Sequence, residues 1–354
     1  MKNKHPLVCC FGQLGDMIML TPLLKRLNDR SGLSCDIVAI GEWNQALFDS
    51  MPYVNNIHTV EPVNTPYLFN KSQKSLVKFL KKSNYENVWI CDSNKKIIWL
   101  LNKGGVTPDK SISSYAVPRL INEHIVSHWQ RLADMTPDHC NYPLLNSKQA
   151  ENTELFVTDY ETDVCKNWLR TRGINHKAPL VCIQSGNKRA TRVGGKKRSH
   201  SSKYWPRANW AKTIDSILTT MPDAQILLCG TPSQQSHTLE IKALCNHQSN
   251  IYSVASELPL RRLITLLSIS HSCISVNADP AHVAAAVNCP LTALVGKTDA
   301  RVFSPKSSES NVILVAGRND EIDLKDGEAA WKTAHDMNLI TVDAVIDGWK
   351  KSFS

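Results

Sequence analysis

The sequence predicts an α/β protein whose 354 residues form two halves, each built on a parallel β-sheet. Short apolar runs alternate with stretches of helical spacing through the first half, and the same alternation starts again in the second half. Residues 174–179, preceded by Gly173 and ending at Pro179, read as a polar linker between the halves. Because strands joined through helices pair in parallel, we expect two doubly wound domains.

The first half opens with an apolar strand and a glycine-containing turn. Thr21 and Pro22 indicate the start of a helix, since proline lacks an N–H that a first turn does not use, and Gly173 indicates the end of another. Expected strands cover residues 7–11, 35–40, 56–60 and 87–91, and expected helices cover 21–29, 44–50, 71–82, 122–135 and 158–173. Residues 102–118 are rich in loop-forming residues.

The second half repeats this rhythm at shorter intervals. Expected strands cover residues 180–184, 225–229, 251–253, 273–276, 291–295 and 312–314, and expected helices cover 207–220, 234–245, 258–269, 281–287 and 342–351. We therefore expect the chain to divide into a domain of residues 1–173, a second domain of residues 174–330 and a helical tail of residues 331–354.

Composition narrows the class of protein. The chain is 42% hydrophobic and 21% charged, as in soluble globular proteins, and no apolar run approaches the roughly 18 residues that span a bilayer. The eleven cysteines are odd in number and scattered, several inside apolar strands, so we expect buried thiols in a cytoplasmic protein. Neither a C-x-x-C nor an H-E-x-x-H pattern occurs, so no metal site is expected.

The formal net charge is +9 and is unevenly distributed. Between Gly186 and Trp210 eight lysines and arginines occur without a single carboxylate. Such a run is typical of a solvated loop or a nucleic-acid patch, but its aromatic residues are not interleaved for base stacking. We expect an acidic sugar acceptor or an anionic membrane face instead, and no nucleic acid.

Residues 271–305 contain the most specific pattern. An apolar strand breaks at Asn277-Ala278-Asp279-Pro280, and a helix rich in alanine follows with Ala281 and His282 in its first turn. Asp279 suits a cap and Pro280 suits the first turn, so backbone N–H groups and the positive end of the helix dipole would lie at the strand's carboxyl end. An anionic ligand is favoured there.

Two further blocks accompany this one. Gly15-Asp16 follows the first strand and leads to Thr21-Pro22, which places Asp16 at the sheet edge where open α/β proteins bind ligands. Ser185-Gly186 ends a strand in mid-chain and precedes Lys203-Tyr204-Trp205-Pro206. The tryptophans of that block read as anchors of a proline-started helix.

Together these blocks resemble glycosyltransferase family 9, the heptosyltransferases. The family's Gly-Asp-x-x-x-x-Thr-Pro matches residues 15–22, and its Lys-x-Trp-Pro-x-x-x-Trp matches residues 203–210. Its Asp-Ser/Thr-Gly-Pro-x-His and Gly-x-Thr-Asp-Pro match residues 277–282 and 296–300. The matches stand in the family's order and extend over residues 7–305.

The resemblance implies a GT-B architecture of two Rossmann-like domains facing a central cleft. The N-terminal domain would bind the acceptor, the C-terminal domain the nucleotide-sugar, and the tail would pack back on the N-terminal domain. The implied activity is inverting transfer of a heptose from ADP-heptose to an acidic glycolipid acceptor of the lipopolysaccharide core type, without metal or cofactor. The enzyme would be cytoplasmic and peripheral at the inner face of the cytoplasmic membrane.

The resemblance also implies residue roles. Asp16 would be the general base, although an ordinary helix cap is the structural alternative. Lys203 would stabilise the departing diphosphate. The expected donor contacts are Ser185, Gly186, Lys203, Gln234, Asn277, Asp279, Pro280, Ala281 and His282, with Gly15, Arg189, Arg192, Thr298 and Asp299 as additional candidates. Thr298 and Asp299 either face the cleft or cap the next segment, and Arg189 and Arg192 either contact phosphate or belong to a solvated loop.

Three positions depart from the family. Its acidic residue falls on Asn277, its glycine falls on Asp279, and the glutamate that holds the donor's ribose is replaced by Gln234. An amide hydrogen-bonds hydroxyls without charge assistance. These departures leave room for another nucleotide-sugar, for a sugar-nucleotide epimerase, or for a homologue that binds a nucleotide-sugar without catalysis.

Overall fold

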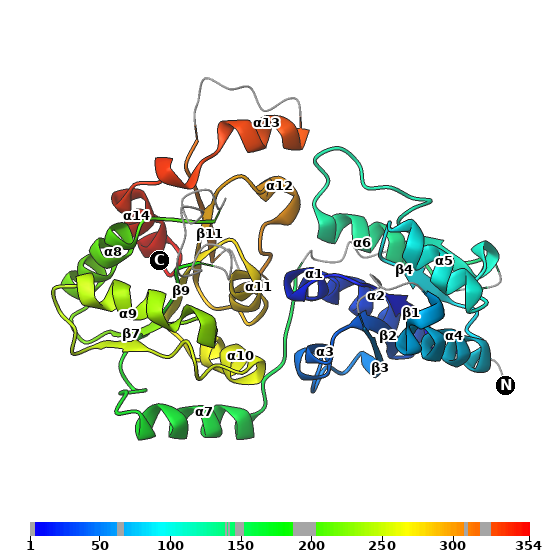
Figure 1. The fold of residues 1–354 in the computed structure, drawn as a ribbon, viewed down its shortest axis with the longest axis horizontal. Coiled ribbons are helices and arrows are strands. Elements are labelled where there is room, and N and C mark those ends of the chain that lie inside the picture. Colours follow the sequence, from blue (N-terminus) through cyan, green and yellow to red (C-terminus); the bar gives the residue numbers. More distant parts are fainter. Residues whose placement is uncertain are drawn as a thin grey trace. The chain divides into compact units, whose positions relative to one another are not determined.

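Two parallel β-sheets form the framework of the protein. The computed structural model describes residues 4–61, 67–138, 140, 142–145, 152–186, 203–307, 311–318 and 327–354. The chain divides into two units, Met1–Thr153 and Glu154–Ser354, and each unit contains one sheet with helices on both faces (Figure 1). This arrangement confirms the predicted α/β class with two doubly wound sheets.

The first sheet has five strands in the order β3-β2-β1-β4-β5. The central strand β1 (Leu7–Cys9) pairs in parallel with β2 and with β4, and its three residues are fully buried. Burial on both faces explains why it is apolar throughout rather than alternating. The other strands are β2 (Cys35–Ile40), β3 (Val54–Val60), β4 (Val88–Ile90) and β5 (Ser111–Ser113).

Helices cover this sheet and connect its strands. They are α1 (Leu14–Met19), α2 (Thr21–Ser31), α3 (Trp43–Leu47), α4 (Lys71–Ser83), α5 (Lys95–Lys103) and α6 (Ile125–Asp134), with short 3₁₀ turns η1 (Tyr67–Phe69) and η2 (Pro108–Lys110). Helix α2 starts at Thr21 with proline in its first turn, as predicted. It ends at Gly32, whose φ of 68° is a left-handed conformation that glycine adopts without strain.

The second sheet has six strands in the order β11-β10-β9-β6-β7-β8. Its strands are β6 (Leu180–Gln184), β7 (Gln225–Leu228), β8 (Ile251–Ser253), β9 (Ser272–Val276), β10 (Leu291–Val295) and β11 (Val312–Ala316). Its helices are α7 (Asp159–Thr171), α8 (Arg207–Thr220), α9 (Gln235–Leu244), α10 (Leu260–Ser268), α11 (Asp279–Ala286), α12 (Ala300–Phe303), α13 (Gly327–Ala334) and α14 (Val342–Lys351), with 3₁₀ turns η3 (Pro232–Gln234) and η4 (Met337–Leu339).

The strand order reverses once within each sheet. In the first sheet the chain moves outward through β2 and β3, then returns to the other side of β1 with β4. In the second sheet the corresponding reversal lies between β6 and β9. Open α/β sheets bind ligands outside the carboxyl ends of the strands at such a reversal. The loops after β1, β4, β6 and β9 are therefore the places to look for function.

Helix α7 belongs to the second unit, so the division falls at residues 153 and 154 rather than at 173 and 174. Its Glu161 receives two hydrogen bonds of 2.6 Å from Arg261 of α10. Its Trp168 donates to Glu257 at 3.2 Å. These contacts join residues about a hundred positions apart, which explains why the glycine and proline of the expected linker did not reveal the boundary.

The C-terminal helix α14 packs on the second unit. It lies against β10, β11 and α8, and the fully buried Trp349 donates from Nε1 to Ser272 Oγ of β9 at 2.8 Å. A Cβ at Gly348 would come 2.8 Å from Val315, so glycine is what allows this close approach to the sheet. The buried side chains of α14 are thus part of the second unit's core.

Candidate functional site

Asp16 lies in the first turn of α1, directly after the loop that leaves β1. It forms a capping box with Gln13: its Oδ2 accepts the Gln13 backbone N–H at 2.8 Å. A Cβ at Gly12 would lie 2.5 Å from the Asp16 Cβ, so the loop passes over the carboxylate only because residue 12 has no side chain. Gly15, the residue directly before Asp16, is buried. Asp16 is half-buried, and the Gln13 N–H orients its carboxylate.

A second carboxylate, Asp92, follows β4 at the same reversal and was missed in the sequence. It accepts the backbone N–H of Asn94 at 2.7 Å and that of Phe11, from the loop after β1. Burial raises the pKa of Asp92, and the charge of Asp16 raises it further, while the two backbone hydrogen bonds act in the opposite direction. The reversal between β1 and β4 therefore carries two interacting carboxylates. An aspartate directly after an apolar strand was the available signal.

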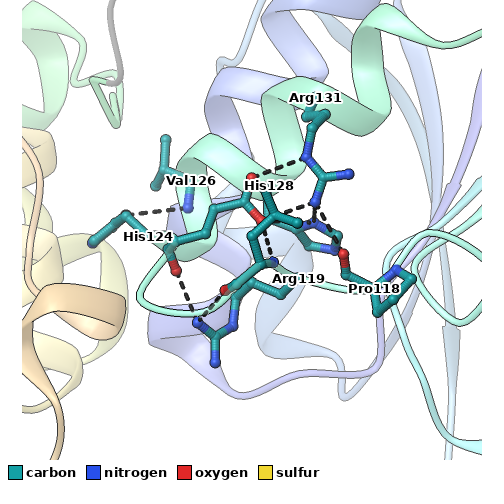
Figure 2. A network of polar contacts seen from close by, with 8 residues as sticks. Pro118, Arg119, His124, Val126, His128 and Arg131 are labelled. Atoms are coloured by element: carbon teal, nitrogen blue, oxygen red, sulfur yellow. Dashed lines mark hydrogen bonds and ion pairs between the residues drawn. The ribbon is translucent and has the colours of Figure 1, made fainter. Parts of the chain in front are cut away.

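A charged network in the same unit fixes the segment before α6 (Figure 2). Arg131 donates from Nε and Nη2 to the Glu123 carboxylate at 2.9 and 2.8 Å, and also to the Pro118 carbonyl at 3.0 Å. The Leu120 N–H donates to Glu123 at 2.8 Å. Burial lowers the pKa of His128 to about 4, and its Nδ1 accepts from Arg131 at 3.0 Å, since a guanidinium can only donate. Because its members bond one another, we interpret the network as structural.

In the second unit, Ser185 and Gly186 follow β6 and are buried. The Gly186 carbonyl accepts from Gln184 Nε2 at 2.6 Å and from Gln234 Nε2 at 3.0 Å. Gln234 Oε1 in turn accepts from the Thr231 N–H at 2.9 Å and its hydroxyl at 3.2 Å. The side chain of Gln234 is 4% exposed and ties the loop after β6 to the loop after β7. The nitrogen and the oxygen of its side-chain amide are thus both hydrogen-bonded within the protein.

The loop from β9 into α11 is next to β6, since Gln184 pairs with Ser275. Asn277 is buried and donates its N–H to Leu294 O at 2.9 Å. The expectation that Asp279 caps α11 is wrong: Ala278 is the N-cap residue and Asp279 is the first helical residue, exposed at the positive end of the helix. The N-cap is a residue without a side-chain acceptor, so no hydrogen bond from it occupies the first-turn N–H groups.

The first turn of α11 has the expected composition. Pro280 lies within it, and Ala281 and His282 are buried. Ala278 and Ala281 are small, which leaves room beside them for a ligand to approach the backbone N–H groups. Asn277, Asp279 and these three residues thus share the β6–β9 reversal with Ser185 and Gly186, to which Gln234 is hydrogen-bonded from the loop after β7.

The loop after β10 has a structural role in the case of Asp299. Asp299 is the N-cap of α12 and accepts the Arg301 backbone N–H at 3.0 Å. The Arg301 guanidinium donates to the same carboxylate at 3.0 and 2.6 Å, and Asp299 is 4% exposed. Of the two roles expected for Asp299, the structure thus shows capping of the next segment. Thr298, beside it, is half-buried.

Lys203 precedes the anchored start of α8. Trp205 is fully buried, donates to Ile340 O at 3.1 Å and packs edge-on against Trp210 at 4.9 Å between ring centroids. Helix α8 returns antiparallel from β6 to β7, so its N-terminus lies at the carboxyl edge of the sheet. Lys203 therefore lies on the side of Ser185 and of the α11 N-terminus. Arg189 and Arg192 lie outside the described residues.

Metal-ligating groups do not cluster in this region. No three His, Cys, Asp or Glu side chains converge on a point in the described ranges. The eleven cysteines are free thiols and ten are buried. No helix of those ranges is long and apolar enough to cross a membrane.

Comparison with known proteins gives consistent matches. Residues 116–333 match the model of the family described as Glycosyltransferase family 9 (heptosyltransferase). Lipopolysaccharide heptosyltransferase 2 of Salmonella typhimurium is 21% identical over 326 residues, 86% of each chain.

Two solved structures share the fold. The ADP-heptose lps heptosyltransferase II of E. coli superposes with a TM-score of 0.71 at 20% identity, covering 99% of this chain and 98% of that one. A family 9 glycosyl transferase from Veillonella parvula gives a TM-score of 0.74 at 14% identity, covering 100% and 98%. Both neighbours support the two-domain GT-B architecture.

Proposed function

The chain belongs to glycosyltransferase family 9, and we propose that it transfers a heptose from ADP-heptose to an acceptor of the lipopolysaccharide core type, with inversion at the anomeric carbon. The observation that carries the proposal is the pair of sheet reversals. One holds a fixed carboxylate, Asp16, and the other holds buried loops with a helix N-terminus suited to a diphosphate. The names of the relatives, which act on lipopolysaccharide, support the choice of acceptor.

In the proposed reaction the acceptor hydroxyl attacks the anomeric carbon of the donor. The new carbon–oxygen bond forms on the face opposite the leaving group, and the bond to the β-phosphate oxygen breaks with its electron pair. Asp16 takes the proton of the hydroxyl as general base. A residue with a side chain at position 12 would displace the Asp16 carboxylate. Gly12 therefore contributes to the mechanism by leaving this carboxylate in its position.

The leaving ADP gains negative charge as the bond breaks. We assign its stabilisation to the Lys203 ammonium and to the first-turn N–H groups of α11, which need no metal ion. Ser185, Gly186, Asn277, Asp279, Pro280, Ala281 and His282 form the rest of the proposed donor site, with Thr298 and Gly15 as further candidates. The reaction would take place at the inner face of the cytoplasmic membrane, where a glycolipid acceptor is anchored.

Gln234 and Asp299 are exceptions within the expected site. The polar side-chain atoms of each residue are hydrogen-bonded to neighbouring protein groups. We therefore assign both residues to holding the loops in place and not to binding the donor. This observation favours one alternative: a family 9 enzyme that holds its nucleotide-sugar without a carboxylate at position 234, and therefore with a different preference for the sugar nucleotide.

A nucleotide panel tests the donor. The full-length protein is heated with ADP, UDP, GDP or CMP, each with EDTA or with magnesium. ADP at about a hundred times its Kd should raise the Tm by about 5–10 °C, equally with and without metal. Stabilisation by UDP or GDP alone would contradict ADP-heptose as donor, and a response that needs magnesium would contradict the role given to Lys203.

A further inference from the structure

Large apolar side chains are exposed where the first unit's chain enters α4. Leu68 and Phe69 of η1 are 72% and 79% exposed, and Trp99 of α5 is 51% exposed. Directly after this turn, Asn70 caps α4 by accepting the Gln73 N–H at 2.9 Å. Contact of such apolar surface with water is unfavourable, and this cost is removed when another phase covers the surface.

Aromatic and cationic contacts join this turn to α5, which packs beside α4. The rings of Tyr67 and Trp99 meet edge-on at 5.7 Å between centroids. The Lys103 Nζ lies over both rings, at 5.0 and 5.4 Å from their centroids. The turn that carries Leu68 and Phe69 therefore lies directly beside Trp99 of α5.

The same surface is strongly basic. Helices α4 and α5 contain eight lysines, all exposed, and neither helix contains an aspartate or glutamate. None of the eight is ion-paired with a described residue. The lysines are Lys71, Lys74, Lys78, Lys81, Lys82, Lys95, Lys96 and Lys103. We call these lysines, with Leu68, Phe69 and Trp99, the α4–α5 patch.

Helical spacing explains how the charges line up. Lys71, Lys74 and Lys78 recur three and four residues apart on α4, opposite its buried face. On α5, Lys95 and Lys103 stand one turn before and one turn after Trp99. The lysines of α5 thus flank the exposed Trp99, and those of α4 lie on that helix's exposed face.

We propose that the α4–α5 patch docks the enzyme on an anionic phospholipid bilayer. Leu and Phe at the tip suit insertion beneath the headgroups, Trp and Tyr suit the interface, and lysines suit anionic headgroups. The proposal rests on the proposed function only for its purpose, which is to bring the first unit to a membrane-anchored acceptor.

The composition of the patch disfavours two other occupants. Protein interfaces are depleted in lysine and enriched in arginine, yet residues 67–110 contain nine lysines and no arginine. Nucleic acid would need aromatic platforms for stacking, whereas Leu68 and Phe69 offer adjacent apolar groups at a turn.

The test measures vesicle binding by co-sedimentation, with no donor or acceptor present. Vesicles of phosphatidylcholine are compared with vesicles that contain about one part phosphatidylglycerol to three parts phosphatidylcholine. Lys71→Gln/Lys74→Gln/Lys103→Gln removes three charges from the patch, and Leu68→Ser/Phe69→Ser removes the apolar tip. Lys177→Gln/Lys212→Gln/Lys351→Gln is the matched control, since it removes three exposed charges from the second unit.

We expect binding to the anionic vesicles only. The patch lysine variant should bind on the order of 100-fold more weakly, because each lysine near such a surface contributes about fivefold. The serine variant should also bind the anionic vesicles more weakly. The control variant should bind them within about threefold of the wild type, because it loses only long-range electrostatic attraction.

Equal losses in the patch variant and the control would overturn the proposal, as would equal binding to neutral vesicles. Binding of the wild type to a single-stranded RNA but not to vesicles would overturn it in favour of nucleic acid. Because these outcomes involve no turnover, they are independent of whether ADP-heptose is the donor. Wild-type activity on a soluble acceptor fragment should persist in the patch variants.

Discussion

Replacing Gln234 by glutamate tests the assignment of this residue to loop attachment. The change restores the carboxylate that the family resemblance leads one to expect, yet removes the Nε2–H that donates to Gly186 O at 3.0 Å. In place of a donor, a carboxylate oxygen would face a buried carbonyl. The lost hydrogen bond and the unsatisfied oxygen cost about 2–4 kcal/mol, and stronger hydrogen bonds from Thr231 offset roughly 1 kcal/mol of this.

We therefore expect Gln234→Glu to destabilise the protein by about 1–3 kcal/mol at neutral pH, a fall of about 3–10 °C in Tm. The buried glutamate would have a raised pKa in the folded state, so the folded protein would bind more protons than the unfolded chain. The loss should consequently shrink as the pH falls, because the protonated acid donates to Gly186 O again.

The assay is thermal unfolding of the wild type and the variant over a pH series. Gln235→Glu is the matched control, since the same chemical change is made one residue further on at an exposed position in the first turn of α9. It should change the Tm by less than about 2 °C. An unchanged Tm for Gln234→Glu at neutral pH, together with tighter ADP binding, would refute the structural role of Gln234.

Three further predictions concern the two sheet reversals and the network before α6. Lys203→Gln should lower kcat by roughly 100-fold with little change in Tm, as measured by steady-state kinetics and thermal unfolding, if it acts on the leaving group; a fall in Tm with normal kcat would contradict this role. Asp92→Asn should move the acidic limb of the pH–kcat/KM profile to lower pH, because a negative charge beside Asp16 is removed; an unmoved limb would contradict their interaction. His128 has a folded pKa of about 4, below its unfolded value, so the unfolded chain binds more protons in between. Stability should therefore fall as the pH falls from about 6.5 to 4, and His128→Gln should flatten that dependence in urea unfolding.

The sequence predicted those parts of the fold that depend on local pattern. Strands such as β1 and β6 are apolar at every position because both faces are buried, and this reads directly from the chain. Helix α5 was missed, because Ile97 to Leu101 form an unbroken apolar run that does not reveal helical period. Strand β5, Ser111–Ser113, was missed because it is a short polar edge strand.

Parts that depend on distant contacts were not readable. The assignment of α7 to the second unit rests on the Glu161–Arg261 pair, which joins residues a hundred positions apart. The use of the Gln234 amide rests on a carbonyl 48 positions away. In the site, motif matches located the loops after β1, β6 and β9, but they did not show which polar atoms in those loops were already hydrogen-bonded.

The proposed catalytic role of Asp16 is tested most directly by Asp16→Asn. Asparagine keeps the size of the side chain and an oxygen that can accept the Gln13 N–H, so the capping box can persist while the base is lost. The measurement is the rate of heptose transfer from ADP-heptose at saturating donor and acceptor, with ADP affinity measured on the same preparation. We expect kcat to fall by about 10²–10⁴ with the Kd for ADP unchanged. A kcat within about twofold of the wild type would contradict the assignment of Asp16 as general base.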